Sequence, residues 1–418
     1  MVRLEDNKFY TEDKPIERFS PPPKVYIPLS QHLGKPCRPL VGAGDTVSLG
    51  QKIGAADAHV YAPVHASLPG KVAAIADWPH PVLGRAKAVI IEGDNSLSAQ
   101  AEEISPRKDA DRLTPEDIKK IVFDAGIVGM GGASFPAHIK LSPPKPVDTL
   151  IINGAECEPY LTADYRLMIE KKEEIAKGIE LAARCLEAKK VFVAVEDNKP
   201  GAFDAFNYEL RILKSVYPQG GEKQLVKSVL GKEVPRGKLP FDLGVVVHNV
   251  ATIFAIYEAV YLNKPLYERV VTVTGSILEN PRNLLARVGT TIKELIASCG
   301  PLKEEPAKII IGGPMMGIAQ YTDEVPVVKS TNGILLLGRK EAACLEEEYC
   351  IRCGACVREC PAGLMPCMIN LASEKSLWQE AKEYGALDCI ECGICSYTCP
   401  ANRRLVQSIK RAKLEAAR

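Results

Sequence analysis

The sequence predicts a multidomain protein that combines α/β and α+β units. Its 418 residues exceed one typical domain, and roughly 150 residues per domain would give about three. Helix-like and strand-like segments alternate through the middle of the chain, which favours an α/β unit. Eight of the 14 cysteines gather in two short runs near the C-terminus. We therefore divide the chain into units of residues 1–107, 108–265, 266–336 and 337–418.

Composition narrows the choice of function. The 53 lysines and arginines nearly balance the 52 aspartates and glutamates, so net charge gives no argument for a nucleic-acid partner. The chain opens without the apolar segment of a secretory signal, and we expect it in the cytoplasm, where cysteines stay reduced. Its most apolar stretch, residues 244–262, contains His248, Asn249 and Glu258. We interpret it as a strand, a polar turn and a helix, so any membrane role would come through a partner.

The first unit, residues 1–107, contains short apolar segments separated by Gly, Asp and Pro turns, a pattern typical of a small β domain. The spacing of two related patterns, at residues 41–54 and 62–72, resembles the barrel-sandwich domains of biotinyl and lipoyl carriers. Such carriers present a modifiable lysine at a hairpin tip, whereas residues 65–69 here read His-Ala-Ser-Leu-Pro. We expect a barrel-sandwich fold without a carried cofactor.

The second unit shows the alternation of an α/β domain. We expect helices at 115–125 and 166–188 and strands at 149–153 and 190–195. A glycine-rich segment, residues 126–136, lies between the first helix and the first strand. Glycine lets backbone N–H groups approach a phosphate or a flat ring. A structural turn explains such a cluster about equally well, and the spacing is not the G-x-G-x-x-G fingerprint.

The third unit reads as strand, helix and strand, at residues 270–275, 291–299 and 308–311. Elements of this size suggest a compact β-grasp-like module. Met315 and Met316 follow the last strand. We interpret them as packing or loop residues rather than metal ligands, because thioethers are soft, adaptable apolar groups.

The two cysteine runs each read C-x2-C-x2-C-x3-C-P, the ligand spacing of a bacterial two-cluster ferredoxin. In that fold each run supplies three ligands to one [4Fe–4S] cluster and its fourth cysteine to the other. We therefore predict one cluster on Cys350, Cys353, Cys356 and Cys399, and a second on Cys389, Cys392, Cys395 and Cys360. Structural zinc usually takes pairs of such ligands, and disulfides are rare in the cytoplasm. The fourth unit should be a ferredoxin-like, α-helical two-cluster domain.

The last segment, residues 402–418, has a helical pattern with a basic face. Its basic residues are Arg403, Arg404, Lys410, Arg411, Lys413 and Arg418. A solvated terminal helix would explain the pattern, and docking on a membrane partner or on anionic lipid is the alternative. High salt would screen such an electrostatic attachment.

The order of these units resembles the C subunit of the Rnf electron-transport complex over nearly the whole chain. This resemblance rests on the carrier-like N-terminus, the β-grasp (SLBB-like) module and the cysteine segment 350–356. The central unit also resembles the NADH-binding flavoprotein subunit of respiratory complex I. The matching residues are the glycine segment 129–136 and the acidic motif 153–159, Asn-Gly-Ala-Glu-Cys-Glu-Pro. The resemblance implies a central domain that binds FMN and NADH.

Carried over residue by residue, the resemblance implies two groups of site residues. Those expected along the FMN phosphate and ring are Gly129, Gly131, Gly132, Lys140, Asn153, Asn249 and Thr252. Glu156 would lie beside the flavin, with Glu158 and Glu233 toward NADH. Phe135 is a candidate for stacking on the cofactor, although a core position is the commoner role of such a residue. Ser134 and Ala155 depart from the pattern, since they replace a common glycine and an aspartate of the complex I motif.

The resemblance implies an electron-transfer subunit of an ion-translocating ferredoxin:NAD+ oxidoreductase. Electrons would pass between NAD(H), FMN and the two [4Fe–4S] clusters, because a flavin accepts either a hydride or single electrons. The implied partners are membrane and flavoprotein subunits of the complex, with ferredoxin reached through another subunit. The chain would attach peripherally to the cytoplasmic face of the membrane. The alternatives are a soluble NADH-dependent cobalamin reductase, in which the carrier-like unit is C-terminal, and an electron-transfer scaffold without nicotinamide.

Overall fold

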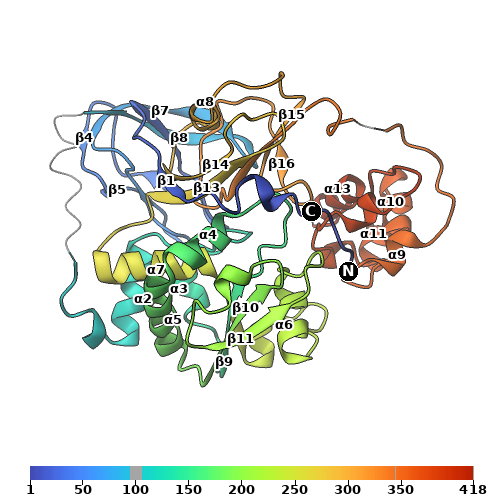
Figure 1. Cartoon of the computed structure of the whole chain (residues 1–418), viewed down its shortest axis with the longest axis horizontal. Helices are drawn as coiled ribbons and strands as arrows, with labels where there is room; N and C mark the ends of the chain where they lie inside the picture. Colours follow the sequence, from blue (N-terminus) through green and yellow to red (C-terminus); the bar gives the residue numbers. More distant parts are fainter. Residues whose placement is uncertain (95–105, 344, 418) are drawn as a thin grey trace.

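The computed structural model describes residues 1–94, 106–343 and 345–417. Figure 1 shows a main body, formed by the barrel sandwich, a six-stranded sheet and the central α/β domain, with a small helical domain at one side. The N-terminus lies next to this helical domain, which also contains the last helix of the chain, and the terminal ammonium of Met1 is 3.6 Å from the Glu359 carboxylate. The short 3-10 helices are η1 (Lys8–Tyr10), η2 (Ala110–Arg112), η3 (Pro200–Ala202), η4 (Pro240–Leu243) and η5 (Ala386–Asp388).

The barrel sandwich forms as predicted, from two antiparallel sheets. One has the order β2-β8-β7-β4 and the other β3-β5-β6. Their bounds are β2 (Lys24–Pro28), β3 (Arg38–Pro39), β4 (Thr46–Val47), β5 (Lys52–Ala55), β6 (Val64–His65), β7 (Gly70–His80) and β8 (Gly84–Gly93). The alternating apolar side chains of Val25, Ile27 and Ile91 fill the space between them. The Ser67 hydroxyl, in the stretch where a carrier would present its lysine, is buried and donates a 2.5 Å hydrogen bond to the Val288 carbonyl.

The six-stranded sheet has the order β1-β14-β13-β17-β15-β16. Its strands are β1 (Ile16–Arg18), β13 (Glu268–Thr274), β14 (Arg282–Arg287), β15 (Lys308–Ile311), β16 (Ile318–Ala319) and β17 (Gly333–Leu337). The helix α8 (Ile292–Ser298) packs Ile292, Leu295 and Ile296 onto this sheet. The edge strand β1 comes from the N-terminus and pairs in parallel with β14. This pairing joins segments that are 267 residues apart, as in Ile16 with Asn283, which periodicity within one segment does not predict.

The central domain is a parallel sheet in the order β11-β10-β9-β12 with helices on both faces. Its elements are α2 (Pro115–Asp124), α3 (Ala137–Lys140), β9 (Thr149–Gly154), α4 (Ala163–Glu170), α5 (Lys172–Leu186), β10 (Lys190–Glu196), β11 (Glu209–Leu213), α6 (Glu222–Leu230), β12 (Val245–Asn249) and α7 (Val250–Leu262). The helix predicted at 166–188 is two helices, because Lys171 leaves helical geometry with φ −129°.

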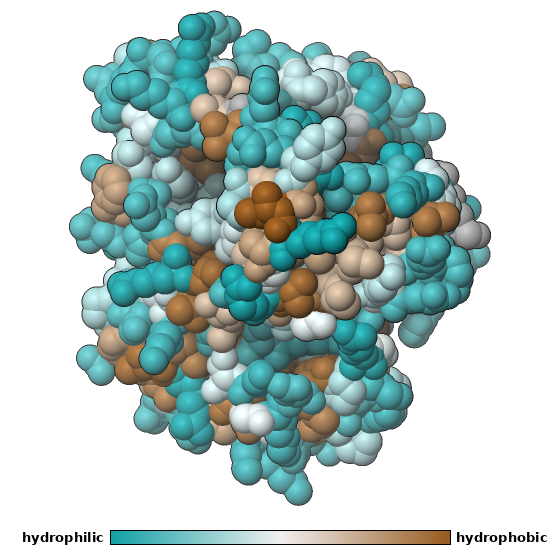
Figure 2. Space-filling model, turned by 90° about the vertical axis from the view of Figure 1, so that its right-hand side faces the viewer, coloured by the Kyte–Doolittle hydropathy of each residue, from teal (hydrophilic) through white to brown (hydrophobic). Residues whose placement is uncertain are grey.

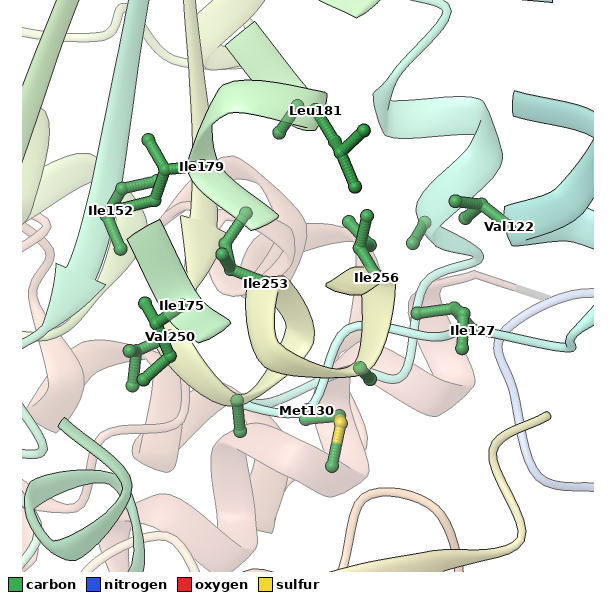
Figure 3. Close-up of a cluster of buried hydrophobic side chains, with 14 of the residues drawn as sticks. Val122, Ile127, Met130, Ile152, Ile175, Ile179, Leu181, Val250, Ile253 and Ile256 are labelled. Atoms are coloured by element: carbon green, nitrogen blue, oxygen red, sulfur yellow. The ribbon is translucent and has the colours of Figure 1, made fainter. Parts of the chain in front are cut away.

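Successive residues of β9 point to opposite faces of the sheet and pack against different helices. Ile152 packs with Ile175 and Ile179 of α5 and Ile253 of α7 (Figure 3), whereas Ile151 packs on the opposite face with α6. The two helices α5 and α7 approach closely at Gly178, where an added Cβ would lie 2.4 Å from the Ile253 carbonyl oxygen. Glycine is therefore required at this crossing.

The helical domain at the C-terminus contains α9 (Ala355–Arg358), α10 (Pro366–Glu374), α11 (Trp378–Glu383), α12 (Ile394–Tyr397) and α13 (Leu405–Ala416). Helix α13 buries Leu405, Ile409 and Ala412 against the rest of the domain. Its basic neighbourhood is paired internally: Arg403 and Arg404 with Glu347, Lys410 and Lys413 with Glu391, and Arg411 over Trp378. Arg418 lies outside the described residues. These contacts account for the basic pattern without a membrane surface.

Across residues 1–94, 106–343 and 345–417, no helix is both long enough and apolar enough to cross a lipid bilayer.

Candidate functional site

The central sheet has a topological switch point between β9 and β12. The chain proceeds from β9 outward to β10 and β11 and then returns to place β12 on the other side of β9. In open parallel sheets, ligands bind outside the carboxyl ends of the strands at such a point. Asn153 and Asn249 stand at the carboxyl ends of these two strands and are register partners. Two residues predicted near the flavin therefore lie side by side at the expected edge.

Asn249 and Thr252 organise the start of α7. The Asn249 amide oxygen accepts hydrogen bonds from the N–H groups of Ala251 (2.9 Å) and Thr252 (3.3 Å), which caps the helix. The Thr252 hydroxyl accepts from the Met130 N–H at 2.9 Å. The helix start is thus tied directly to the glycine segment.

Behind Asn249 lies a buried carboxyl group. The Asn249 amide donates to Asp164 Oδ2 at 2.6 Å, while Asp164 Oδ1 is buried and has no hydrogen-bond partner within the described part of the chain. Burial, followed by the nearby charge of Glu156, raises the pKa of Asp164. The carboxyl group therefore favours its neutral form more than an exposed aspartate does.

The glycine segment forms a loop that is closed at its base. The Gly129 N–H donates to the Phe135 carbonyl at 2.8 Å, and Phe135 itself is half-buried. Gly131 and Gly132 lie at the exposed tip. A Cβ at Gly131 would approach the Asn249 amide nitrogen to 2.9 Å, and one at Gly132 would meet no atom within 4 Å. The loop thus offers backbone to a flat ligand beside Asn249, because side chains at these positions would fill that space.

Two observations complete the edge of the site. Ser134 has φ +54°, a left-handed conformation that favours glycine. Lys140, at the end of α3, donates to the Val247 carbonyl and to Glu222 Oε1, both at 2.6 Å, and its side chain is 29% exposed. A half-buried cation, paired with Glu222, therefore stands beside the middle of β12, two residues before Asn249. The open glycine tip, this cation and the two amide side chains together fit a flat group that carries a phosphate.

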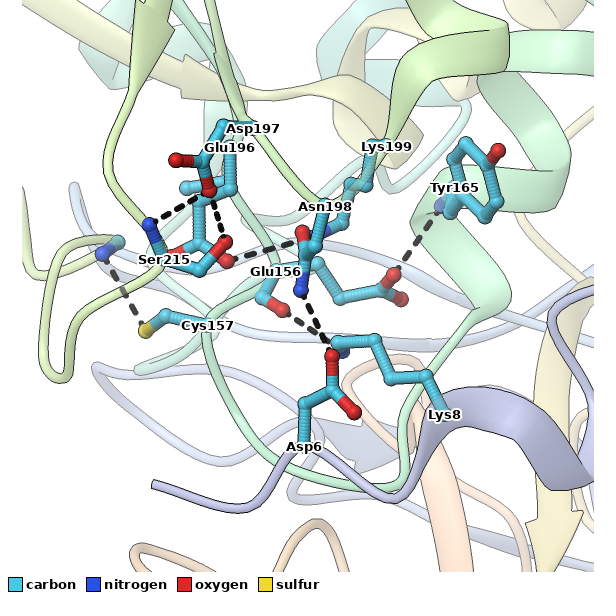
Figure 4. Close-up of polar contacts among 12 residues, drawn as sticks. Asp6, Lys8, Glu156, Cys157, Tyr165, Glu196, Asp197, Asn198, Lys199 and Ser215 are labelled. Atoms are coloured by element: carbon cyan, nitrogen blue, oxygen red, sulfur yellow. Dashed lines mark hydrogen bonds and ion pairs between the residues drawn. The ribbon is translucent and has the colours of Figure 1, made fainter. Parts of the chain in front are cut away.

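Within the acidic motif, Glu156 stabilises the loop itself. Its carboxylate accepts hydrogen bonds from the backbone N–H groups of Asp164 (2.7 Å) and Tyr165 (3.2 Å) at the start of α4 (Figure 4). Asn153 anchors the beginning of the motif, since its amide donates to the Gly220 carbonyl at 2.9 Å and accepts from the Ala155 N–H at 3.1 Å. The Glu156 carboxylate is thus directed to α4.

Lys8 is the site residue that sequence reasoning missed. Its buried ammonium donates to three backbone carbonyls of the acidic loop, those of Glu156 (2.9 Å), Glu158 (2.9 Å) and Leu161 (2.5 Å). Burial, together with the nearby charge of Lys199, lowers the pKa of Lys8. Lys199 is itself paired with Glu196 at 3.3 Å (Figure 4). No local pattern reveals this contact, because its partners are about 150 residues apart.

The three glutamates expected beside the flavin and toward NADH, namely Glu156, Glu158 and Glu233, are not brought together. The Glu158 carboxylate accepts from the N–H groups of Met315 (3.2 Å) and Met316 (2.7 Å), so it holds the loop after β15. Burial raises its pKa. Glu233 is 72% exposed and pairs with Lys227. Helix α6 begins at Glu222 beside Lys140, and its nine residues span about 13 Å, which puts Glu233 beyond the far end.

The second cysteine run forms a cavity with a cysteine of the first. Cys360, Cys389, Cys392 and Cys395 line this cavity together with apolar residues that include Leu364 and Ile409. This grouping is the crossed set that the spacing predicts for the second cluster. Burial raises the pKa of Cys392 to about 11 and that of Cys395 to about 12, and a bound metal centre would stabilise such thiols in their deprotonated form. In the described residues, no three His, Cys, Asp or Glu side chains converge on a single-ion site.

The other set is more open. Cys356 is buried and interacts electrostatically with Cys399, which agrees with the crossed pairing. Cys350 and Cys353 are exposed on a segment without regular structure. Cys367, a residue not predicted here, lies beside Cys356 and forms a hydrogen bond with it. The four predicted ligands are therefore divided between a buried half and an exposed half.

Comparison with family models matches four segments of the chain. The matches are the RnfC barrel sandwich hybrid domain at residues 2–96, the Nuo51 FMN-binding domain at 122–258, the SLBB domain at 270–319 and the 4Fe-4S dicluster domain at 343–400. They confirm the predicted fold class and the predicted FMN and cluster domains. The fold and the two sites define an electron-transfer protein of the flavin and iron–sulfur class.

Whole-chain relatives narrow this class to one family. The chain is 48% identical to the C subunit of the proton-translocating ferredoxin:NAD(+) oxidoreductase complex of Clostridium ljungdahlii, over 99% of this chain and 93% of that protein. It is 45% identical to the Na(+)-translocating counterpart of Acetobacterium woodii, over 97% of this chain and 94% of that protein. The chain belongs to the family of C subunits of ion-translocating ferredoxin:NAD(+) oxidoreductase (Rnf) complexes, as the resemblance predicted. A soluble cobalamin reductase is thereby set aside.

A solved structure shares part of the fold. A chain of an NAD+-reducing [NiFe]-hydrogenase in the H2-reduced state matches 73% of this chain and 64% of its own length, with a TM-score of 0.51 at 17% identity. This likeness concerns the arrangement of the domains alone.

Proposed function

We propose that this chain passes electrons between NAD(H), FMN and two [4Fe–4S] clusters as a peripheral subunit of an ion-translocating ferredoxin:NAD+ oxidoreductase. The observation that carries this proposal is the switch-point site. There Asn153 and Asn249 end adjacent strands and the exposed glycine tip borders Asn249, in a chain whose C-terminal domain gathers four thiols around one cavity. FMN, when bound, exchanges a hydride with nicotinamide and single electrons with the clusters.

The residues of the site have positioning roles. Gly131 and Gly132 leave the backbone accessible to the ring, and Lys140 offers positive charge to the phosphate. Asn249 and Thr252 fix the glycine loop against α7. Glu156 and Glu158 keep the acidic loop rigid, so their contribution to nicotinamide binding is indirect. Glu233 stands apart from this set, and its replacement should leave NADH binding unchanged.

Membership of the family makes this chain one subunit of a larger complex. We propose that its partners are the membrane and flavoprotein subunits of that complex, with ferredoxin reached through another subunit, and that it attaches at the cytoplasmic face. The internal pairing of the basic residues around α13 favours attachment through protein contacts over attachment to anionic lipid.

The test is anaerobic purification followed by iron, sulfide and flavin analysis and titration with NADH. We expect eight iron atoms and one FMN per chain, as two four-iron clusters and one flavin site require, and bleaching of the flavin and cluster absorption by NADH. A cluster-replete protein that neither contains nor takes up flavin would refute the flavin assignment. Bound flavin that NADH does not reduce would instead support the electron-transfer scaffold without nicotinamide.

A further inference from the structure

We propose that the cluster bound by Cys389, Cys392, Cys395 and Cys360 is the one that exchanges electrons with the flavin. The cluster of the first run then lies on the outer side, where it meets the partner. This inference rests on the proposed function and adds the order of the two clusters, together with the residues that join the flavin domain to the inner one.

The second cysteine run is packed directly against the central domain. Cys392 and Ile394 share a buried apolar cluster with Tyr217, and Cys157 and Met315 pack against its edge. Tyr217 is 1% exposed and Cys392 is 7% exposed. Water is therefore excluded from the junction between the inner cluster and the acidic motif. Electron tunnelling falls steeply with distance, and a dry, close-packed junction of this kind is where it is most efficient.

A continuous series of contacts leads from this junction to the switch point. The Asn153 amide donates to the Gly220 carbonyl at 2.9 Å, and the Gly220 N–H donates to Cys157 Sγ at 3.2 Å. Cys157 then contacts the apolar cluster that contains Tyr217 and Cys392. Every step between the predicted flavin site and the inner cluster is therefore a hydrogen bond or a van der Waals contact within this chain.

Two further sets of contacts hold the segments that carry the inner set of cysteines in place. Glu158 accepts from the N–H groups of Met315 and Met316, and the Met315 carbonyl oxygen lies where a Cβ on Gly393 would come within 2.8 Å. This glycine belongs to the second run, so the loop that Glu158 holds rests directly on it.

The loop after Cys360 is held from the other side. The side chain of Gln224 donates to the Pro361 carbonyl at 3.4 Å, and that of Arg236 donates to the Gly363 carbonyl at 3.3 Å. Both donors come from α6 or the segment after it. The loop after Cys360 and the segment Cys392–Ile394 therefore both contact the flavin domain.

The beginning of the first run is exposed rather than packed at this junction. Cys350 and Cys353 are exposed, and the neighbouring Tyr349 and Ile351 are 94% and 66% exposed. Figure 2, which views the molecule from the side of the helical domain, shows apolar side chains interspersed with polar ones on this face. An exposed cluster edge among apolar side chains suits electron exchange with another protein.

The experiment compares Cys392→Ala with the matched variant Cys353→Ala, which removes a ligand from the outer set. Both proteins are purified anaerobically as full chains, and dithionite reduction followed by electron paramagnetic resonance identifies the cluster that each retains. NADH is then mixed rapidly with each protein and the samples are frozen at set times. We expect the remaining inner cluster of Cys353→Ala to be reduced at the wild-type rate. The remaining outer cluster of Cys392→Ala should be reduced at least about tenfold more slowly, although the flavin is still bleached.

The opposite pattern would overturn the order: fast reduction of the outer cluster in Cys392→Ala and slow reduction of the inner cluster in Cys353→Ala. A wild-type flavin that NADH does not bleach would refute the proposed function itself, which is a separate result. If Cys392→Ala loses both clusters, the same rapid-mixing measurement on Tyr217→Ala tests the order of the clusters. The exposed Tyr349→Ala is its control. Slower cluster reduction in Tyr217→Ala alone, with both clusters and flavin bleaching retained, supports the order, and equal rates in the two variants refute it.

Discussion

Replacing Lys8 by methionine should loosen the acidic loop and release the flavin. Methionine keeps the length and apolar stem of the side chain but removes the ammonium that donates to the carbonyls of Glu156, Glu158 and Leu161. Each buried acceptor left without a donor costs about 1–3 kcal/mol. Three of them, at the lower end of this range, give about 3 kcal/mol, since the variant also avoids burying a charge beside Lys199.

A loss of this size is measurable. At about 2–4 °C per kcal/mol for a unit of this size, the unfolding midpoint of the central domain should fall by about 6–12 °C. Circular dichroism gives the midpoint, and flavin released after ultrafiltration gives cofactor retention. Lys71→Met, on an exposed strand position, is the control and should change neither quantity. A Lys8→Met protein that keeps both its midpoint and its flavin would show that the loop does not depend on this ammonium.

Four further outcomes are expected. The buried ammonium of Lys329 donates to the carbonyls of Pro63 and Gly126, and burial lowers the pKa of Lys329 to about 7. Because the unfolded chain binds this proton more tightly, the free energy of unfolding should rise from pH 7 toward the ordinary lysine pKa, by at most about 1.4 kcal/mol per pH unit. Urea unfolding of Lys329→Met should lack this pH dependence. Gly178→Ala should destabilise the central domain by about 1–3 kcal/mol, whereas Gly132→Ala, which meets no atom within 4 Å, should leave the unfolding midpoint unchanged but weaken flavin retention. Lys140→Met should lower FMN affinity about tenfold by equilibrium dialysis, and the exposed Lys145→Met should not. Washing membranes at high salt should leave the chain attached if protein contacts hold it, and release would favour an electrostatic attachment.

Much of the fold follows from local pattern. The strands at β9 and β10 and the helix α2 lie within a residue or so of their predicted bounds, because each is a strongly periodic or continuously apolar segment with clear ends. The single helix expected at 166–188 is interrupted at Lys171. The prediction missed this break because no residue type there marks a change in backbone geometry. The edge strand β1 is short and half-buried, and it exists because β14 offers it a partner.

The candidate site shows the same division between local and long-range information. Asn153 and Asn249 could be predicted as neighbours, since both end strands of one parallel sheet. Lys8 could not, because its three acceptors are backbone carbonyls of a distant loop, which no residue type reveals. The motif indicates that the carboxylates of Glu156 and Glu158 matter, but their direction depends on where α4 and the loop after β15 pack.

The carboxylates of Glu156 and Glu158 bind backbone N–H groups of this chain, which suits a protein whose cofactors carry the redox chemistry. Flavin and clusters carry the redox steps themselves, so the protein contributes distance, orientation and exclusion of water rather than acids and bases. Lys8 fixes the acidic loop from one side, and Glu158 extends that loop to Met315 and hence to the second cysteine run. The N-terminal segment takes part as well, because Val2 pairs with Tyr217 and the Met1 ammonium lies beside Glu359. The acidic residues of the motif therefore connect the flavin domain to the cluster domain. Replacing Glu156 or Glu158 should slow electron transfer between the flavin and the clusters before it changes the redox chemistry of either cofactor.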